Sequence, residues 1–161
     1  PFNIATKGKV SAVAQDFIDF ILSDEGQAVV KKSGYVPVQS GKKYAGAKPA
    51  GKIVVAGSSS VSPVMEKLKE AYLAVNNKAQ IEIQTNDSSA GMLAAREGIC
   101  DIGMASRALK DSEKEVLQST VIAMDGIAVI VNNKNPLKAL SLAQVRDIFT
   151  GAIRKWSAVV E

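Results

Sequence analysis

Histidine is absent from the 161 residues of the chain, and cysteine occurs once. Without histidine there is no histidine-based catalytic triad and no imidazole metal ligand, and the commonest general base of enzymes is missing. Cys100 stands beside a short apolar segment, which predicts a small buried residue rather than a nucleophile. One cysteine cannot form an internal disulfide and does not indicate a redox compartment. The sequence therefore weakens most hydrolase hypotheses and predicts neither a metal nor a cofactor.

Aromatic residues and long apolar runs are also scarce. Aromatics make up 5% of the chain and the lysines are scattered, which argues against a stacking surface for nucleic acid. No apolar run approaches the about 18 residues that a membrane span needs, and residues 1–4 are not typical of a secretory signal. The net charge of +4 leaves small anions as ligands. With 47% hydrophobic residues, the chain is expected to form one soluble domain with a well-packed core.

Apolar periodicity predicts the local structure on both sides of a linker-like segment. Residues 2–6 are expected to form a strand, and apolar residues at helical spacing follow from Val10 to Ile21. Ser23 is expected to start a second helix that stops at Gly34, before an extended segment at 35–38. Residues 39–51 are rich in Gly, Ala, Lys and Pro and predict a mobile, solvated connector.

After the linker, strand and helix patterns alternate, as expected for an α/β fold built as a three-layer sandwich with a mostly parallel sheet. Capping-box patterns predict helix starts at Ser112 with Glu115 and at Ser141 with Gln144. The predicted strands cover residues 52–56, 81–85, 101–105 and 120–132, and the apolar run at 127–131 is expected to be covered on both faces.

Serine residues follow three of these strands. One interpretation is that Ser60 or Ser62 only caps the next helix, with Pro63 in its first turn. The other is an oxyanion site, because ligands of open α/β sheets gather at the carboxyl ends of the strands. Three loops with the same chemistry favour the oxyanion site, and the order of residues excludes a nucleotide-binding P-loop. The hydroxyl-bearing residues of these loops are Ser58, Ser59 and Ser60 in the first, Ser88 and Ser89 in the second, and Ser106 in the third, which Arg107 follows.

Four motifs in register resemble the phosphate-binding proteins of bacterial ABC phosphate transporters. They occupy residues 56–61, 101–107, 125–132 and 142–151, and Trp156 follows the last of them. The resemblance covers nearly the whole chain outside the linker. It implies one lobe of a type II periplasmic-binding-protein fold, in which two α/β lobes close on phosphate without catalysis.

The order of the segments departs from that family. Residues 1–38 resemble the family's C-terminal part of the first lobe, and residues 52–161 resemble its N-terminal part. Segment 39–51 joins them, and the second lobe expected after Trp156 is absent. The resemblance therefore suggests a circularly permuted, engineered single lobe, all one domain, with Pro1 and Glu161 side by side.

Position by position, the resemblance makes Ser59 and Ser88 hydroxyl donors and Ser60 a backbone donor. Many family members carry an aspartate in the third loop that accepts the proton of hydrogen phosphate, where this chain has Arg107. Arg107 is either a charged donor or a surface or hinge residue. The aspartates that could replace that acceptor are Asp87 and Asp125, for which capping and hinge roles are the alternatives.

The predicted function is phosphate or oxyanion binding, weak or lost in an isolated lobe, with self-association through the former cleft face. The alternative is an engineered folding protein without a ligand. An enzyme with Ser59 as nucleophile would lack a general base. The resemblance implies an extracytoplasmic parent, periplasmic or lipid-anchored, that meets an ABC transporter permease, whereas this chain would be a recombinant product.

Overall fold

The structure, a computed structural model, describes residues 1–159. The chain divides into two compact units, Pro1–Gly126 and Ile127–Glu161. The expected strand at 127–131 is wrong, because these residues form no strand and Ile127 is 97% exposed. The predicted proximity of Pro1 and Glu161 lies outside the described residues.

The first unit contains a six-stranded sheet with strand order β2-β6-β1-β5-β3-β4. The pairs β3–β4 and β3–β5 are parallel, whereas β1–β5, β1–β6 and β2–β6 are antiparallel. The strands are β1 (Phe2–Thr6), β2 (Val36–Pro37), β3 (Gly51–Ser58), β4 (Ala79–Asn86), β5 (Ile102–Ala105) and β6 (Gln118–Met124).

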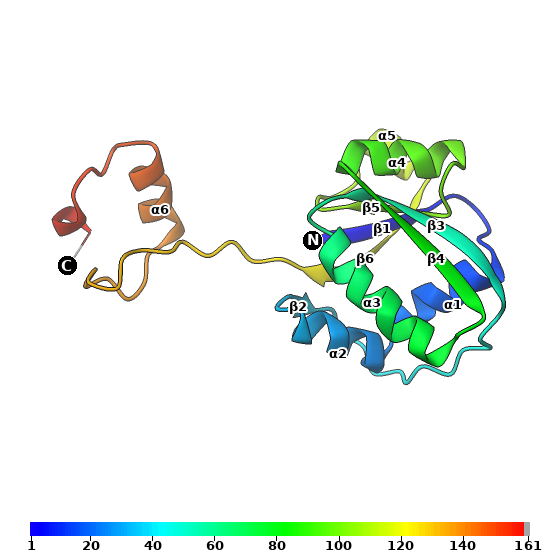
Figure 1. The fold of residues 1–161 in the computed structure, drawn as a ribbon. Helices are drawn as coiled ribbons and strands as arrows, with labels where there is room; N and C mark the ends of the chain where they lie inside the picture. Colours follow the sequence, from blue (N-terminus) through cyan, green and yellow to red (C-terminus); the bar gives the residue numbers. More distant parts are fainter. Residues whose placement is uncertain (160–161) are drawn as a thin grey trace. The chain divides into compact units, whose positions relative to one another are not determined.

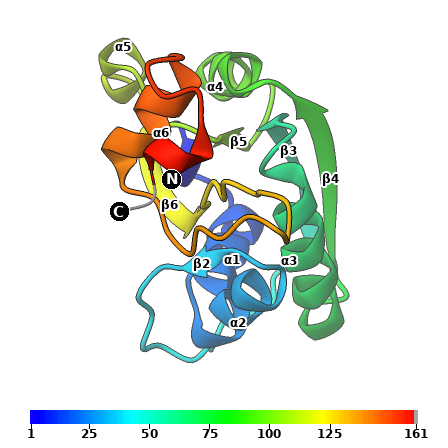
Figure 2. The same ribbon diagram turned by 90° about the vertical axis from the view of Figure 1, so that its left-hand side faces the viewer.

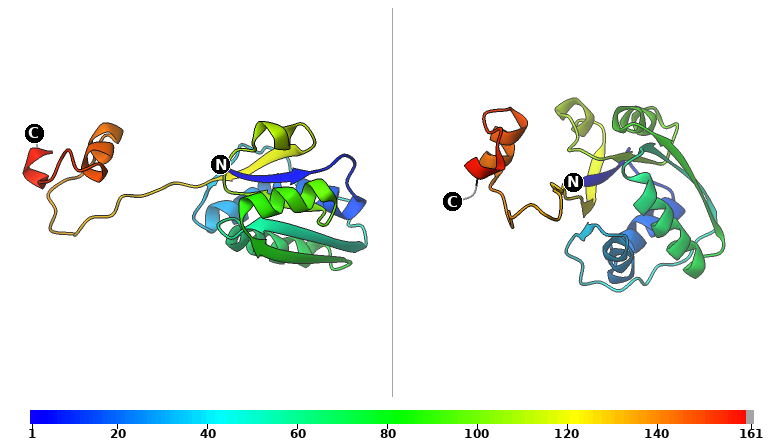
Figure 3. Two further views of the ribbon diagram at one scale, coloured as in Figure 1. Left: turned by 90° about the horizontal axis from the view of Figure 1, so that it is seen from above. Right: turned by 60° about the vertical axis from the view of Figure 1, so that its left-hand side comes forward.

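The sheet is thus mixed rather than mostly parallel. The four strands that follow the linker run in one direction, as the helical crossovers α3 and α4 require for β3, β4 and β5. The two strands that precede the linker run the opposite way, and β1 lies between β5 and β6 (Figure 3, left). No local pattern in residues 2–6 indicates this insertion.

Helices cover both faces of the sheet, which confirms the predicted three-layer α/β lobe (Figures 1 and 2). On one face, α1, α2 and α3 pack over a large core around Phe17, Leu68 and Tyr72. On the other, α4 packs over a smaller core that includes Met92 and Cys100. The helices of this unit are α1 (Ala12–Ile21), α2 (Asp24–Lys32), α3 (Ser62–Val75), α4 (Ser88–Glu97) and α5 (Asp111–Lys114).

Side-chain caps fix most helix starts. The Ser11 hydroxyl accepts the Ala14 N–H, so α1 begins after Ser11, and Ser23 caps α2 as predicted. One predicted capping box is wrong. Helix α5 starts after Lys110, whose N–H donates to Glu113, so Ser112 with Glu115 is not the capping pair.

Helix α3 lacks the serine cap that was the alternative to the anion site, because its N-cap is Val61 and makes no side-chain hydrogen bond. Ser62 is already helical. Its hydroxyl donates to the Ser58 carbonyl oxygen and accepts from the Thr85 hydroxyl. These serines therefore do not have the capping role that competed with the anion hypothesis.

Residues 39–50 have no regular secondary structure, as expected of a linker, but they are hydrogen-bonded to helices α1 and α2. The Gly41 N–H donates to the Asp24 carboxylate, and the Tyr44 N–H donates to the Glu25 carboxylate. The Tyr44 hydroxyl donates to buried Asp16 at 2.6 Å, and Asp16 also accepts from the Tyr72 hydroxyl at 2.7 Å. This segment therefore takes part in the packing of the first unit.

The second unit is small. Its α6 (Leu142–Phe149) begins with the predicted capping box of Ser141 and Gln144, and a short 3₁₀ helix covers Trp156–Ala158. A mainly apolar cavity of about 290 Å³ lies between α6, Trp156 and the extended run at 129–131. In neither unit does any helix described within residues 1–159 have the length and apolarity to cross a membrane.

Candidate anion site at the strand ends

The register of the parallel strands brings the three serine loops to one edge of the sheet. Ser58 at the end of β3 pairs with Asn86 at the end of β4, and Gly57 pairs with Met104 in β5. Each strand leads directly into one of the predicted loops. The sheet thus places the carboxyl ends of β3, β4 and β5 together, as the anion hypothesis requires.

The first loop is held mainly through its backbone. Ser58 is buried, and its carbonyl oxygen accepts from the Val61 N–H at 3.0 Å. The Ser59 N–H donates to the Asn86 carbonyl oxygen at 2.8 Å, which ties the first loop to the second. Among the described residues, Ser60 finds no hydrogen-bond partner for its N–H or its exposed hydroxyl group. Ser60 therefore has its N–H and its hydroxyl group free for a ligand, and exposed Ser59 has its hydroxyl group free, because that group makes no hydrogen bond within residues 1–159 either.

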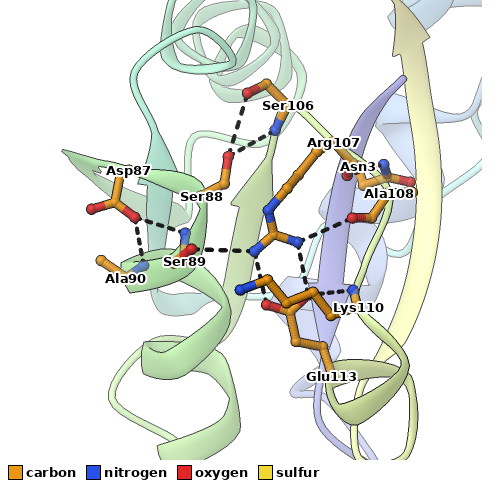
Figure 4. Close-up of polar contacts among 10 residues, drawn as sticks. All are labelled: Asn3, Asp87, Ser88, Ser89, Ala90, Ser106, Arg107, Ala108, Lys110 and Glu113. Atoms are coloured by element: carbon orange, nitrogen blue, oxygen red, sulfur yellow. Dashed lines mark hydrogen bonds and ion pairs between the residues drawn. The ribbon is translucent and has the colours of Figure 1, made fainter.

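The second and third loops contact each other through side chains (Figure 4). The Ser88 and Ser106 hydroxyl oxygens lie 3.3 Å apart, and Ser88 also accepts the Ser106 N–H at 3.1 Å. Asp87 caps α4 by accepting the N–H groups of Ser89 and Ala90. These two hydrogen bonds and the nearby Arg107 charge lower the pKa of Asp87, so it stays ionised and engaged in capping.

Arg107 joins this cluster as half of an ion pair. Its two terminal nitrogens each lie 2.8 Å from one carboxylate oxygen of Glu113, and Nη2 also lies 3.3 Å from the Ser89 hydroxyl. The hydrogen bonds from Arg107 lower the pKa of Glu113 to about 2, and those to Glu113 raise the pKa of Arg107. The guanidinium therefore reaches the serine loops with its charge largely balanced.

Small residues allow α4 to approach the sheet beneath these loops. A Cβ atom on Gly91 would lie 2.5 Å from the Gly57 Cα and 2.8 Å from the Ala56 carbonyl oxygen. Gly57 has a φ of +139°, and a Cβ there would meet the Met104 carbonyl oxygen. Glycine at both positions lets the start of α4, with Ser88 and Ser89, lie close to the ends of β3 and β5.

The predicted site residues thus fall into two groups. Ser88, Ser89, Ser106 and Arg107 are joined by hydrogen bonds, whereas Ser58, Ser59 and Ser60 share the same edge through strand register and one backbone bond.

Two further residues were missed by the sequence analysis. Glu113 pairs with Arg107, and the Asn3 side-chain amide donates to the Arg107 carbonyl oxygen at 2.8 Å. A glutamate at the third position of α5 was a local signal for Glu113, but Asn3 lies 104 positions from its partner and had none.

The groups at this edge of the sheet are mainly hydrogen-bond donors. Exposed hydroxyl groups, a free backbone N–H and a paired guanidinium suit the oxygens of an anion. Burial raises the pKa of Cys100 to about 11, so its thiol stays protonated at neutral pH. Within residues 1–159 there is no group of His, Cys, Asp and Glu that could hold a metal ion.

The fold is an α/β lobe whose strand ends carry hydrogen-bond donors. Residues 42–160 match the profile of a family described as the PBP superfamily domain. The chain belongs to this PBP superfamily.

Its relatives are bacterial phosphate-binding proteins. The chain is 56% identical over 159 residues to phosphate-binding protein PstS 2 of Streptococcus agalactiae, covering 98% of this chain and 54% of the relative. The crystal structure of the phosphate-binding protein of a Streptococcus pneumoniae phosphate ABC transporter superposes with a TM-score of 0.91 at 42% identity, over 99% of this chain and 63% of that one.

A third comparison involves a Clostridium perfringens structure that contains bound phosphate. It superposes with a TM-score of 0.57 at 46% identity, over 67% of this chain and 45% of that chain. The chain thus spans about half the length of the curated relatives that it matches.

Proposed function

We propose that the chain forms a phosphate-binding lobe of an ABC-transporter substrate-binding protein and that it acts by binding rather than by catalysis. The observation that carries this proposal is the convergence of three hydroxyl-bearing loops at the ends of β3, β4 and β5. The names of the relatives support phosphate as the anion.

Neutral donors dominate the proposed site. Ser88 and Ser106 form one wall with their hydroxyl groups, and Ser60 offers its N–H and hydroxyl from the neighbouring loop. Such donors hold an anion by hydrogen bonds that replace its water shell, and Arg107 adds a charged donor beside Ser89. The carboxylates of Asp87 and Glu113 beside these loops are both engaged in hydrogen bonds. Asp125, the other aspartate considered as an acceptor, is exposed directly after β6 and makes no hydrogen bond among the described residues.

The remaining length of the relatives is proposed to supply the opposite wall of the cleft. Only about half of each relative corresponds to this chain, so half of the phosphate oxygens would face solvent here. Because several charge-assisted hydrogen bonds of about 1.5–3 kcal/mol each would be missing, we expect millimolar or weaker affinity.

The order of segments is proposed to be natural. The alignment with the Streptococcus agalactiae relative covers 98% of this chain, so one natural protein carries the segments before and after the linker in this order. This supports a natural arrangement over an engineered permutation. The proposal also includes an extracytoplasmic location, an ABC transporter permease as partner, and self-association through the cleft face. Light scattering over a concentration series tests the self-association.

A phosphate titration of the wild type and two serine variants tests the binding function. Ser88→Ala removes a site hydroxyl, and Ser119→Ala, at an exposed position of β6, is the matched control. We expect a dissociation constant of about 1 mM or weaker for the wild type and the control, and several-fold weaker binding for Ser88→Ala. Micromolar binding by the monomer would contradict the half-cleft account, and equal binding by the two variants would contradict the site.

A further inference from the structure

The ion pair between Arg107 and Glu113 fixes a flexible side chain at the edge of the candidate site. Both carboxylate oxygens of Glu113 accept from the guanidinium at 2.8 Å, and one of them also accepts the Lys110 N–H at 2.7 Å. The Glu113 side chain is 15% exposed and that of Arg107 30%. Two parallel hydrogen bonds to a shielded carboxylate define the plane of the guanidinium as well as its position.

The donors of Arg107 are almost fully engaged. Nη1 donates to Glu113 and to the Ala108 carbonyl oxygen, while Nη2 donates to Glu113 and to the Ser89 hydroxyl. The contact with Ser89, at 3.3 Å, is the longest of these bonds, and Nε has no partner among the described residues. A guanidinium held in this way can offer Nε, or Nη2 in place of the Ser89 contact, to an anion at the serine loops (Figure 4).

Glu113 has two opposite effects on an anion bound there. Its negative charge would repel the anion, but that charge is balanced by Arg107 and screened near the surface. Its carboxylate also holds the guanidinium in place, so the anion need not immobilise a long side chain when it binds. Because the charges of Arg107 and Glu113 largely cancel, the pair repels the anion little, and the gain from holding the guanidinium in place exceeds this repulsion.

We propose that Glu113 is a positioning residue of the anion site, which strengthens phosphate binding by holding Arg107 against the second loop even though it carries a negative charge. This inference rests on the proposed function. It assigns Arg107 the role of a charged donor and α5 the role of its support.

The experiment compares two variants that each remove one negative charge from α5. Glu113→Gln breaks the ion pair, whereas Asp111→Asn removes an exposed carboxylate whose ion-pair partner within residues 1–159 is Lys114. Phosphate titrations would follow the amide signals of Ser89 and Ser106. We expect binding about three- to ten-fold weaker for Glu113→Gln, and within about two-fold of the wild type for Asp111→Asn. In an Arg107→Ala background, Glu113→Gln should have no further effect.

The outcomes separate this inference from the function on which it rests. If the wild type shows no phosphate-dependent shift, the proposed function and the inference both fail. If the wild type responds and Glu113→Gln binds equally well or more tightly, only the inference is overturned. Should Glu113→Gln fail to fold, Arg107→Lys replaces it, because lysine keeps the charge but cannot bind a carboxylate through two parallel bonds. Unchanged phosphate affinity in Arg107→Lys would also overturn the inference.

Discussion

Single side chains of the proposed site both offer a hydrogen-bond donor and hold a neighbouring loop in place. Ser88 accepts the Ser106 N–H, and because one of the Ser88 and Ser106 hydroxyl groups donates to the other, the second hydroxyl hydrogen is available to an oxyanion. Arg107 contacts Ser89 while Glu113 balances its charge. At this scale the site is a set of local contacts across two loops, which only the folded sheet brings together.

The titration of Glu113 gives a prediction for acid stability. Its pKa is lowered from its usual 4.5 to about 2, chiefly by hydrogen bonds from Arg107. A lowered pKa in the folded state stabilises the protein above pH 4.5, and this contribution is lost as the pH falls towards 2. Glu113→Gln should therefore cost about 1 kcal/mol at neutral pH, since the pair lies near the surface, and the difference from wild type should shrink over this window.

Urea denaturation at pH 7, 4.5, 3 and 2 measures this effect. Asp111→Asn, on the same helix, is the control, and its deficit should be small at every pH. A constant difference between Glu113→Gln and the wild type from pH 7 to pH 2 would contradict the assigned ion pair.

Residue identity alone predicted the hydroxyl donors but not their supports. Serines after strands carry a recognisable local pattern, and Ser88, Ser89 and Ser106 do lie together. The sequence analysis gave Glu113 no role for two reasons. Its partner Arg107 comes close to it only through the tertiary position of α5, and the local pattern predicted Ser112 with Glu115 as the capping pair. The contacts of Arg107 with Asn3 and Glu113 depend on the tertiary structure, so no local pattern pairs these residues.

The elements before the linker complete the unit formed by those after it. Strand β1 lies between β5 and β6, and its Asn3 holds the third loop through the Arg107 carbonyl oxygen. Segment 39–50 runs along α1 and α2 and places Tyr44 against Phe20 at 5.3 Å between ring centroids. The linker is therefore part of the packing of the lobe.

Removing one hydroxyl group tests this role of the linker. Tyr44→Phe keeps the ring but loses the hydrogen bond to buried Asp16, which should lower the free energy of unfolding by about 1–2 kcal/mol. Tyr35→Phe is the matched control, because Tyr35 packs on Phe2 and its hydroxyl has no hydrogen bond among the described residues. Equal stability of the two variants in thermal and urea denaturation would mean that the linker contributes little.

At the scale of elements, the sequence predicted most strands and helices of the first unit but not the topology of the sheet. Periodicity and caps located α1, α2 and the alternation from β3 to β5, because these signals are local. The antiparallel position of β1 depends on long-range pairing. The apolar run at 127–131 resembled a buried strand, but it has no partner strand within the described residues. Ile127 is exposed, and residues 129–131 line a cavity together with α6.

The whole molecule consists of a lobe of 126 residues and a smaller unit. The lobe carries the complete set of strand-end loops predicted for one wall of a phosphate cleft. Relatives about twice as long as this chain provide room for the other wall. The central claim is that this edge of the lobe recognises phosphate by hydrogen bonds from its three loops.

Residue-resolved amide spectra of the wild-type chain during a phosphate titration test that claim most directly. Chloride at matched ionic strength serves as the control for general charge effects. The account predicts that the amide signals of Ser60, Ser88 and Ser106 shift together along one saturation curve at millimolar phosphate, and that chloride leaves them in place. Signals that stay fixed at these three loops, or shifts confined to scattered lysines, would contradict it.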